Sequence, residues 1–153
     1  MDQLKKEDYL AIINSIHDGL YFVDEKRKII FWNDAAERIS GFTEEEVIGK
    51  SCADSILTHI DADGNCLCEN GCPLHATMDD KQSRQDTVYL HHKNGHRIPI
   101  HVRTSPLIDS QGKIIGAVEL FTDVSKQEAN VLRVKELEKL ALLDTLTNLA
   151  NRR

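Results

Sequence analysis

The sequence predicts an α+β fold with five antiparallel strands, several short helices and a long C-terminal helix. Alternating apolar and polar residues mark the strands, because successive side chains of a strand point to opposite faces. Capping residues mark the ends of the short helices. A run of helix formers without glycine or proline, residues 125–143, marks the last helix. Two strands therefore precede the short helices, and three longer strands follow them.

The chain begins with a predicted helix, residues 1–16, followed by a hairpin. The helix carries one apolar stripe at helical spacing. The residues of this stripe are Tyr9, Ile12, Ile13 and Ile16. Residues 19–24 and 29–33 are rich in β-branched and aromatic residues, and the charged stretch 25–28 joins them. This pattern predicts two antiparallel strands connected by a tight turn.

Two short helices are marked by their caps. Asp34 is placed to cap a helix over residues 35–40, and Gly41 is placed to end it. Thr43 is followed three residues later by Glu46, which is a capping-box signature. We therefore expect a second short helix to begin after Thr43.

The three remaining strands are expected after the cysteine-bearing segment. Residues 87–92 alternate, an Asn-Gly pair at 94–95 is typical of a two-residue hairpin turn, and residues 97–103 alternate again. Pro99 indicates an edge or bulged position, since proline cannot donate a backbone hydrogen bond. Residues 113–122 are predicted to form the last strand.

The predicted last helix carries a coiled-coil pattern. Ser125 followed by Glu128 is a capping-box signature at its start. Val134, Leu137 and Ala141 follow the 3-4 spacing of a coiled-coil seam. We therefore expect two copies of the chain to pair through this helix as a parallel coiled coil. The alternative is a helix that folds back on the sheet.

Charge and hydropathy narrow the set of partners. The net charge is −6 and no basic stripe is present, which argues against nucleic acid, because binding a polyphosphate requires a Lys/Arg surface. No apolar run approaches the roughly 18 residues of a membrane span, and the N-terminus lacks the apolar core of a signal peptide. We therefore expect a cytoplasmic protein with no membrane partner.

All four cysteines lie within residues 52–72, in the pattern C-x13-C-x-C-x3-C. The candidate ligands of this segment are Cys52, Cys66, Cys68 and Cys72, together with His59 and His75. Thiolates bind zinc and iron-sulfur clusters, and neighbouring thiols form disulfides. In a reducing cytoplasm this clustering favours a metal site or a redox switch over a permanent disulfide framework.

Several ligand sets compete. All four cysteines suit structural zinc or an iron-sulfur cluster; Cys52, Cys68 and Cys72 with His59 or His75 suit zinc; Cys68 with Cys72 suits a reversible disulfide. The alternative without any cofactor is that the thiols stay free as small buried groups. His75 is a conceivable axial haem ligand, but a lone histidine there is more often a surface residue, and flavin is no better marked.

These elements, in this order, resemble a PAS sensor domain. The resemblance rests on Trp32-Asn33 before a short helix, the stretch 41–50, and Asp123-Val124-Ser125 after the last strand. It implies a five-stranded antiparallel sheet with short helices on one side, curved around a pocket that across the family holds haem, flavin, a small metabolite or nothing. The sensor domain would span residues 17–124, with residues 52–72 as a cysteine-bearing insertion. The closing Asp-x-Thr motif of the family, which passes strain into the exit helix, corresponds here to Asp123 and Ser125.

Residues 144–153 resemble the opening of a GGDEF diguanylate cyclase domain, whose common form is D-x-L-T-x-L-x-N-R-R. Every fixed position is kept, and Asn148 and Ala150 stand where Gly and Pro are frequent. The resemblance implies a cyclase domain that converts GTP to cyclic di-GMP, with its Mg²⁺-binding carboxylates beyond Arg153. Residues 1–153 are therefore expected to have no catalytic activity, and residues 125–143 to be a signalling helix.

The sequence thus predicts a PAS sensor that homodimerises through its C-terminal and N-terminal helices and controls an attached diguanylate cyclase. The expected cue is a redox, metal or small-ligand change near residues 52–72. The alternative is a zinc-stabilised dimerisation module without a sensing role.

Overall fold

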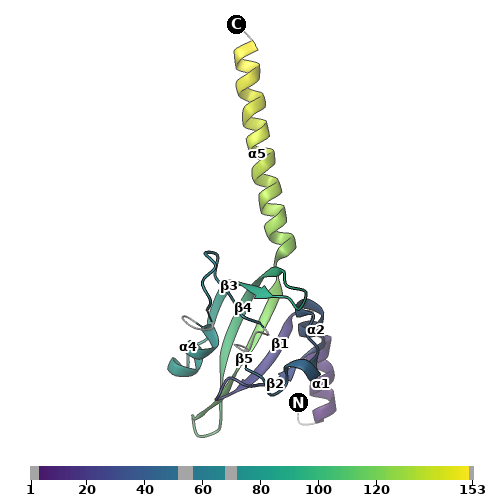
Figure 1. Cartoon of the computed structure of the whole chain (residues 1–153), viewed down its shortest axis with the longest axis vertical. Helices are drawn as coiled ribbons and strands as arrows, with labels where there is room; N and C mark the ends of the chain where they lie inside the picture. The colour runs from purple at the N-terminus through teal and green to yellow at the C-terminus, as the bar shows by residue number, and fades with distance from the viewer. Residues whose placement is uncertain (1–3, 52–56, 68–71, 152–153) are drawn as a thin grey trace. The chain divides into compact units, whose positions relative to one another are not determined.

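The computed structural model describes residues 4–51, 57–67 and 72–151, of which Cys52 and Cys68 are not part (Figure 1). The chain divides into two units, residues 1–123 and residues 124–153. The first unit contains five strands and four helices among its described residues, and the second contains one helix.

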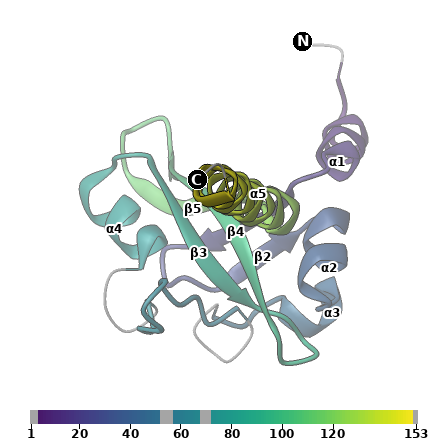
Figure 2. The same ribbon diagram turned by 90° about the horizontal axis from the view of Figure 1, so that it is seen from above.

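The elements follow each other in the predicted order. They are α1 (Lys6–Ser15), β1 (Gly19–Asp24), β2 (Ile29–Trp32), α2 (Asp34–Ser40), α3 (Glu44–Val47), α4 (Pro73–Asp80), β3 (Arg84–His91), β4 (Arg97–Ile108), β5 (Ile114–Asp123) and α5 (Ser125–Asn151). Helices α2 and α3 contact β1 and β2, whereas α4 contacts β3, β4 and β5 (Figure 2).

The strands form one antiparallel sheet in the order β2-β1-β5-β4-β3. The first and last strands of the chain are therefore neighbours, with Tyr21 of β1 opposite Glu119 of β5. Glu119 also lies opposite Thr104 of β4. Side chains directly opposite each other in an antiparallel sheet lie on the same face. The predicted α+β fold is confirmed.

The core fills the inner face of the sheet. Burial alternates along β4, where Ile98, Ile100 and Val102 are buried and Arg97 and Arg103 are exposed, as the sequence pattern predicts. The rings of Tyr21, Trp32 and Phe121 form an aromatic cluster, with centroids 5.4 to 6.3 Å apart. These side chains give the interior a mainly apolar wall.

Asn33, rather than Asp34, caps the short helix α2, so the predicted cap was wrong by one residue. The Asn33 Oδ1 accepts hydrogen bonds of 2.9 Å from the N–H groups of Ala36 and Leu20. Its Nδ2 donates to the carbonyl of Asp18 at 3.1 Å. Asn33 is fully buried and uses both ends of its amide, which Asp cannot do. Gly41 ends the helix with φ 80°, as predicted.

Two other local predictions hold. The Thr43–Glu46 capping box is present at the start of α3. Pro99 pairs with Tyr89 of β3, while β4 pairs with β5 only from Ile100 onward. Pro99 therefore sits where β4 has a neighbour on one side alone, and its missing N–H costs no ladder hydrogen bond.

Two short stretches, one before and one after Cys52, form backbone hydrogen bonds with the two outer strands. On one edge the Ile29 N–H donates to the Lys50 carbonyl at 2.9 Å. On the other edge Ile60 and Tyr89 exchange hydrogen bonds of 3.1 and 2.8 Å. Because β2 and β3 are the outermost strands, the described residues 49–51 lie at one edge of the sheet and residues 57–60 at the other; these two stretches together are here named the crossing segment.

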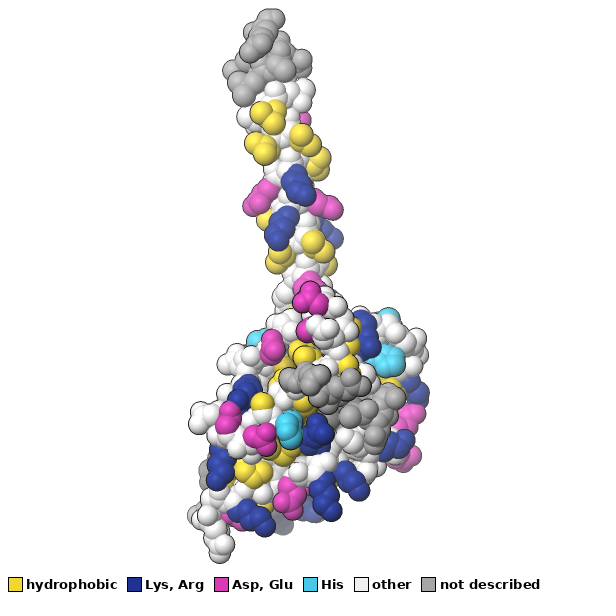
Figure 3. All heavy atoms as spheres, turned by 60° about the vertical axis from the view of Figure 1, so that its left-hand side comes forward, with side chains coloured by type: hydrophobic (Ala, Val, Ile, Leu, Met, Phe, Trp, Pro, Cys, Tyr) yellow, Lys and Arg dark blue, Asp and Glu magenta, His cyan; other side chains and the backbone are white. Residues whose placement is uncertain are grey.

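Helix α5 is longer than predicted. It spans 27 residues, about 40 Å at 1.5 Å per residue, and continues to Asn151 rather than ending at Leu143. Its apolar side chains are exposed along its length (Figure 3), among them Leu132 (63 %) and Leu137 (59 %). Within the described part of the chain, no helix combines the length and apolar character that crossing a membrane demands.

Candidate functional site

A carboxyl group lies in the middle of the inner face of the sheet. Glu119 is fully buried on β5, and its neighbours across the sheet are Tyr21 and Thr104. The Thr104 hydroxyl is 2.7 Å from the Thr77 hydroxyl of α4, which ties that helix to the sheet. Glu119 therefore stands in a polar row that crosses an otherwise mainly apolar surface.

His59 brings a second titratable group to the same place. It belongs to the crossing segment, and its side chain is 6 % exposed. Its Nε2 lies 3.9 Å from Oε2 of Glu119, which is beyond hydrogen-bond distance. Among the residues that the structure describes, none satisfies His59 Nε2, whereas the Tyr21 side chain is a hydrogen-bond partner of the Glu119 carboxyl group. Leaving a buried polar group unsatisfied costs about 1–3 kcal/mol.

Burial determines the charge state of both groups. Burial raises the pKa of Glu119 to about 8. A hydrogen bond from the Tyr21 side chain lowers this pKa in part, and the charge of a Cys72 thiolate would raise it further. Burial, together with the positive charge of Arg97, lowers the pKa of His59 to about 4. Both side chains are therefore neutral at pH 7.

Cys72 completes the buried polar cluster, which consists of Tyr21, His59, Cys72 and Glu119. Cys72 is 9 % exposed and is the N-cap residue of α4, followed by Pro73 at the first helical position as the sequence predicts. The four residues come from β1, the crossing segment, the start of α4 and β5. The cluster thus connects the cysteine-bearing segment to the strand that precedes α5.

The predicted metal ligands divide into three groups. His59 and Cys72 belong to the buried polar cluster. Cys66 is half-buried, and its backbone forms an isolated antiparallel β-bridge with Ile60. His75 is exposed and lies 3.3 Å from the Asp79 carboxylate. Cys52 and Cys68 lie outside the described residues. Among the residues described, no three His, Cys, Asp or Glu side chains are placed to hold one metal ion. The zinc, iron-sulfur and disulfide hypotheses stay predictions that depend on Cys52 and Cys68.

The sequence interpretation missed Glu119 and Tyr21. The signal was present, because Ala117, Glu119 and Phe121 occupy one face of an alternating strand and the two flanking residues are apolar. A carboxylate at such a position is either paired or functional.

The predicted relay residues mark the boundary between β5 and α5. Asp123 is the last residue of β5 and Ser125 is the first residue of α5. Glu119 lies on the same strand, four residues before Asp123. A change at Glu119 therefore has a short covalent route to the start of the helix.

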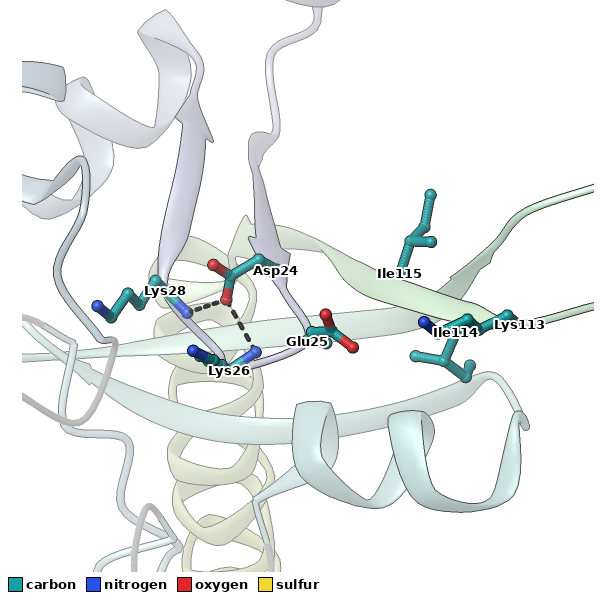
Figure 4. A pocket seen from close by; sticks show the side chains of 7 residues that line it. All are labelled: Asp24, Glu25, Lys26, Lys28, Lys113, Ile114 and Ile115. Carbon is teal, nitrogen blue, oxygen red and sulfur yellow. Dashed lines mark hydrogen bonds between the residues drawn. The ribbon is translucent and has the colours of Figure 1, made fainter.

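A concave region lies at the turn between β1 and β2 (Figure 4). It has a volume of about 380 Å³ and is lined by Asp24, Glu25, Lys26, Lys28, Lys113, Ile114 and Ile115. The Asp24 carboxylate accepts hydrogen bonds of 2.9 Å from the backbone N–H groups of Lys26 and Lys28. These contacts stabilise the turn, and the exposed charges of both signs are solvated.

Comparison with known proteins agrees with this architecture. The sequence profile of the PAS domain family matches residues 17–126. The probable diguanylate cyclase DgcE of Escherichia coli K12 is 30 % identical over 148 residues, which are 97 % of this chain and 13 % of DgcE. The chain thus spans a small part of that relative's length.

Two solved structures share the fold. The PAS domain of a Colwellia psychrerythraea protein superposes with a TM-score of 0.66 at 19 % identity, over 78 % of this chain and 97 % of that one. The VqmA dimer of Vibrio cholerae gives a TM-score of 0.65 at 17 % identity, over 81 % of this chain and 53 % of that one. The sheet order, the profile match and these superpositions lead to one conclusion: the chain belongs to the PAS domain family.

Proposed function

We propose that this PAS domain is the sensory and dimerising part of a cytoplasmic protein whose output is a diguanylate cyclase. The observation that carries the proposal is the continuity of α5, which runs from Ser125 into residues 144–151 without a break. Those residues resemble the opening of a GGDEF domain. The match to the probable diguanylate cyclase DgcE, which spans 97 % of this chain, supports the same assignment.

The proposed input is the buried polar cluster and the cysteine-bearing segment beside it. A ligand, metal or redox change there would alter the position of β5, and Asp123 and Ser125 would pass the change to α5. A ligand shifts the output only by the difference in its affinity for the two helix arrangements. Cys72 and His59 belong both to the cysteine-bearing segment and to the buried polar cluster, where they lie near Glu119. They therefore connect the segment to the cluster.

The proposed output is the pairing of two α5 helices. Val134 and Leu137 of the predicted seam are 53 % and 59 % exposed, and an apolar stripe on a helix is stabilised when a partner covers it. The structurally similar VqmA protein is described as a dimer, which agrees with this proposal. VqmA is also described as DNA-binding, but the net charge of −6 here favours a protein partner over nucleic acid.

The test joins residues 1–151 to the catalytic part of a diguanylate cyclase, in the register of residues 144–151, and measures cyclic di-GMP synthesis. Leu137→Glu places a charge in the predicted seam, whereas Leu132→Glu places the same charge on the outward face. We expect Leu137→Glu to convert the fusion to monomers in sedimentation experiments and to lower its activity at least about tenfold. Leu132→Glu is the matched control, since it should leave both unchanged.

Equal activity of the wild-type fusion, the Leu137→Glu variant and the isolated catalytic part would contradict the proposal. A fusion that responds only to protein concentration, and unfolds on chelation, would instead favour the zinc-stabilised dimerisation module.

A further inference from the structure

Two histidine rings are stacked at the turn between β3 and β4, residues 92–96. The imidazoles of His92 and His96 lie with their ring centroids 4.3 Å apart and an interplanar angle of 20°. The same two residues close the turn, because the His92 N–H donates to the His96 carbonyl at 2.9 Å. Two imidazolium rings at this separation repel each other, so the closed turn disfavours a charge on both.

The closed turn also requires one ring nitrogen of His92 to be free of a proton. Nδ1 of His92 accepts a hydrogen bond of 3.0 Å from the Asn94 N–H. A neutral imidazole has one nitrogen that can accept, whereas both nitrogens of an imidazolium are donors. Protonation of His92 therefore sets two donors against each other and breaks this hydrogen bond.

The same turn lies against the end of α2. The Lys93 N–H donates to the Ser40 carbonyl at 2.9 Å, and Lys93 Nζ forms an ion pair with Glu46 of α3. A Cβ atom added to Gly41 would lie only 2.7 Å from Cε1 of the His92 ring. The His92 ring is thus in close contact with the residue that ends α2.

The base of the hairpin holds the crossing segment. The His91 N–H donates to the Leu57 carbonyl at 2.9 Å, and the Arg97 guanidinium donates to the Thr58 carbonyl at 2.7 Å. These two donors are the chain neighbours of the stacked histidines. A change in the turn therefore reaches the hydrogen bonds that keep residues 57–60 on β3.

The hairpin itself opposes a charge on His92. Partial burial of the ring is the largest cause that lowers the pKa of His92, and the positive charges of His96 and His91 lower it further. The cations Lys93 and Arg97 of the same hairpin do not contribute to the shift. His92 therefore gains its proton below the ordinary pKa of 6.5.

The described elements against the hairpin supply no carboxylate that favours a charged His92. Glu46 of α3 pairs with Lys93, and Glu37 of α2 accepts a hydrogen bond of 2.7 Å from the Glu44 N–H. The other ionisable side chains on α3, at the end of α2 and in residues 57–60 do not contribute to the shift in the pKa of His92 either; they are Arg38, Glu44, Glu45 and His59.

We propose that residues 92–96 form a proton-sensitive latch, which neutral His92 closes and mildly acidic solution opens by protonating its ring. Opening breaks the hydrogen bond to Asn94, detaches Lys93 from the end of α2 and weakens the contacts of β3 with residues 57–60. This inference goes beyond the proposed function, because it adds the proton as a cue that acts outside the buried polar cluster. The stability of the closed latch is fully present above pH 6.5 and is lost as the pH falls through the lowered pKa of His92.

The test is amide hydrogen exchange of the 153-residue chain, followed by NMR between about pH 5 and 8 and expressed as protection factors. We expect the protection of the Lys93 amide to fall at least about tenfold on acidification, with a midpoint below pH 6.5, and that of His91 to fall with it. The Asp109 amide donates to the Lys113 carbonyl at 2.9 Å in the β4–β5 turn, which contains no histidine. This amide is the internal control and should keep its protection.

Three variants assign the effect to His92. His92→Asn keeps an acceptor close to the Asn94 N–H but cannot gain a proton in this range, so the protection of Lys93 should become independent of pH. His96→Gln removes one positive charge and should move the midpoint to higher pH. His101→Asn changes a histidine in the middle of β4 and is the matched control, which should keep the pH dependence of the wild type.

A Lys93 amide that stays equally protected in the wild type from about pH 8 to 5 would refute the latch, and so would a His92→Asn variant with the pH dependence of the wild type. If the fluorescence of Trp32 shows that His92→Asn does not fold, the nitrogen chemical shifts of wild-type His92 decide. The latch requires the proton to be on Nε2 at about pH 8, and a proton on Nδ1 would overturn the inference.

Discussion

Glu119 places a carboxyl group in a layer of side chains that is otherwise mainly apolar. Its pKa of about 8 in the folded chain lies above the ordinary value of 4.5, so the folded state retains a proton that the unfolded state loses. The contribution of Glu119 to the free energy of unfolding is fully present below pH 4.5 and is lost progressively as the pH rises to 8. The contribution of His59 to the free energy of unfolding instead increases between pH 4 and 6.5, because its pKa in the folded chain is lowered to about 4. The two effects compensate between about pH 4.5 and 6.5, and above pH 6.5 only the loss due to Glu119 remains.

We therefore expect the free energy of unfolding to fall by about 2 kcal/mol between pH 6.5 and 8. Glu119→Gln should remove this decline, whereas the exposed Glu128→Gln should keep it. Urea denaturation at stepped pH, followed by the fluorescence of Trp32, measures the change, since Trp32 is the single tryptophan of the chain. A wild-type stability that is level across this range would show that Glu119 is ionised when folded.

At the scale of elements, Asn33 fixes the start of α2 and its attachment to β1. Its amide makes hydrogen bonds with Ala36, Leu20 and Asp18, and it donates to the Ile13 carbonyl at 3.3 Å near the end of α1. One side chain thus joins two helices and a strand.

Asn33→Ala is expected to destabilise the domain by about 2–4 kcal/mol, because a helix cap is lost and buried backbone groups become unsatisfied. Asp34→Ala, at the position that the sequence favoured as the cap, should cost less than about 0.5 kcal/mol. Thermal unfolding of both variants beside the wild type provides the comparison. If Asp34→Ala were the more destabilising of the two, Asn33 would not be the cap that matters.

Most elements were predictable from the sequence because their signals are local. Alternation located the strands, and the Thr43–Glu46 pair located α3. The cap of α2 was misplaced because Asn33 and Asp34 are both good caps, and the choice depends on partners as distant as Asp18. The end of α5 was set too early since residues 144–151 were assigned to the next domain rather than to the helix.

The candidate site was only partly predictable. His59 and Cys72 were candidates because of their residue types, but their common neighbour Glu119 comes from a strand that follows them by more than 40 residues. Only the sheet order, which places β5 between β1 and β4, brings the three together. Pairing across such sequence distances leaves no local pattern.

At the scale of the whole molecule, the cysteine-bearing segment is connected to both edges of the sheet. We expect protein purified without oxygen to carry about one equivalent of zinc, or iron with sulfide, and to lose it when Cys52, Cys68 or Cys72 is changed to Ser. Removal of the metal with a chelator should lower the melting temperature by several degrees, because ordering of the segment is lost. Elemental analysis, absorption spectra and a thiol count provide the measurement.

The variant Cys66→Ser separates the ligand sets, since it removes a ligand from the four-cysteine site and none from the sets that include a histidine. A colourless, metal-free protein with four reactive thiols in air would contradict both the metal site and the redox switch.

The pairing of the crossing segment with β2 and β3 also bears on self-association. The open edge of a sheet is a template on which another chain can add a strand, and aggregation often begins there. In this domain the chain itself occupies parts of both edges, at Ile29 and at Tyr89. The start of β3 carries Arg84, Gln85 and Asp86, whose polar and charged side chains disfavour addition of a strand. A change that detaches the crossing segment from β2 and β3 would therefore leave backbone N–H and C=O groups unpaired on both outer strands. Reversible association of neighbouring molecules through these strands would then accompany the signal.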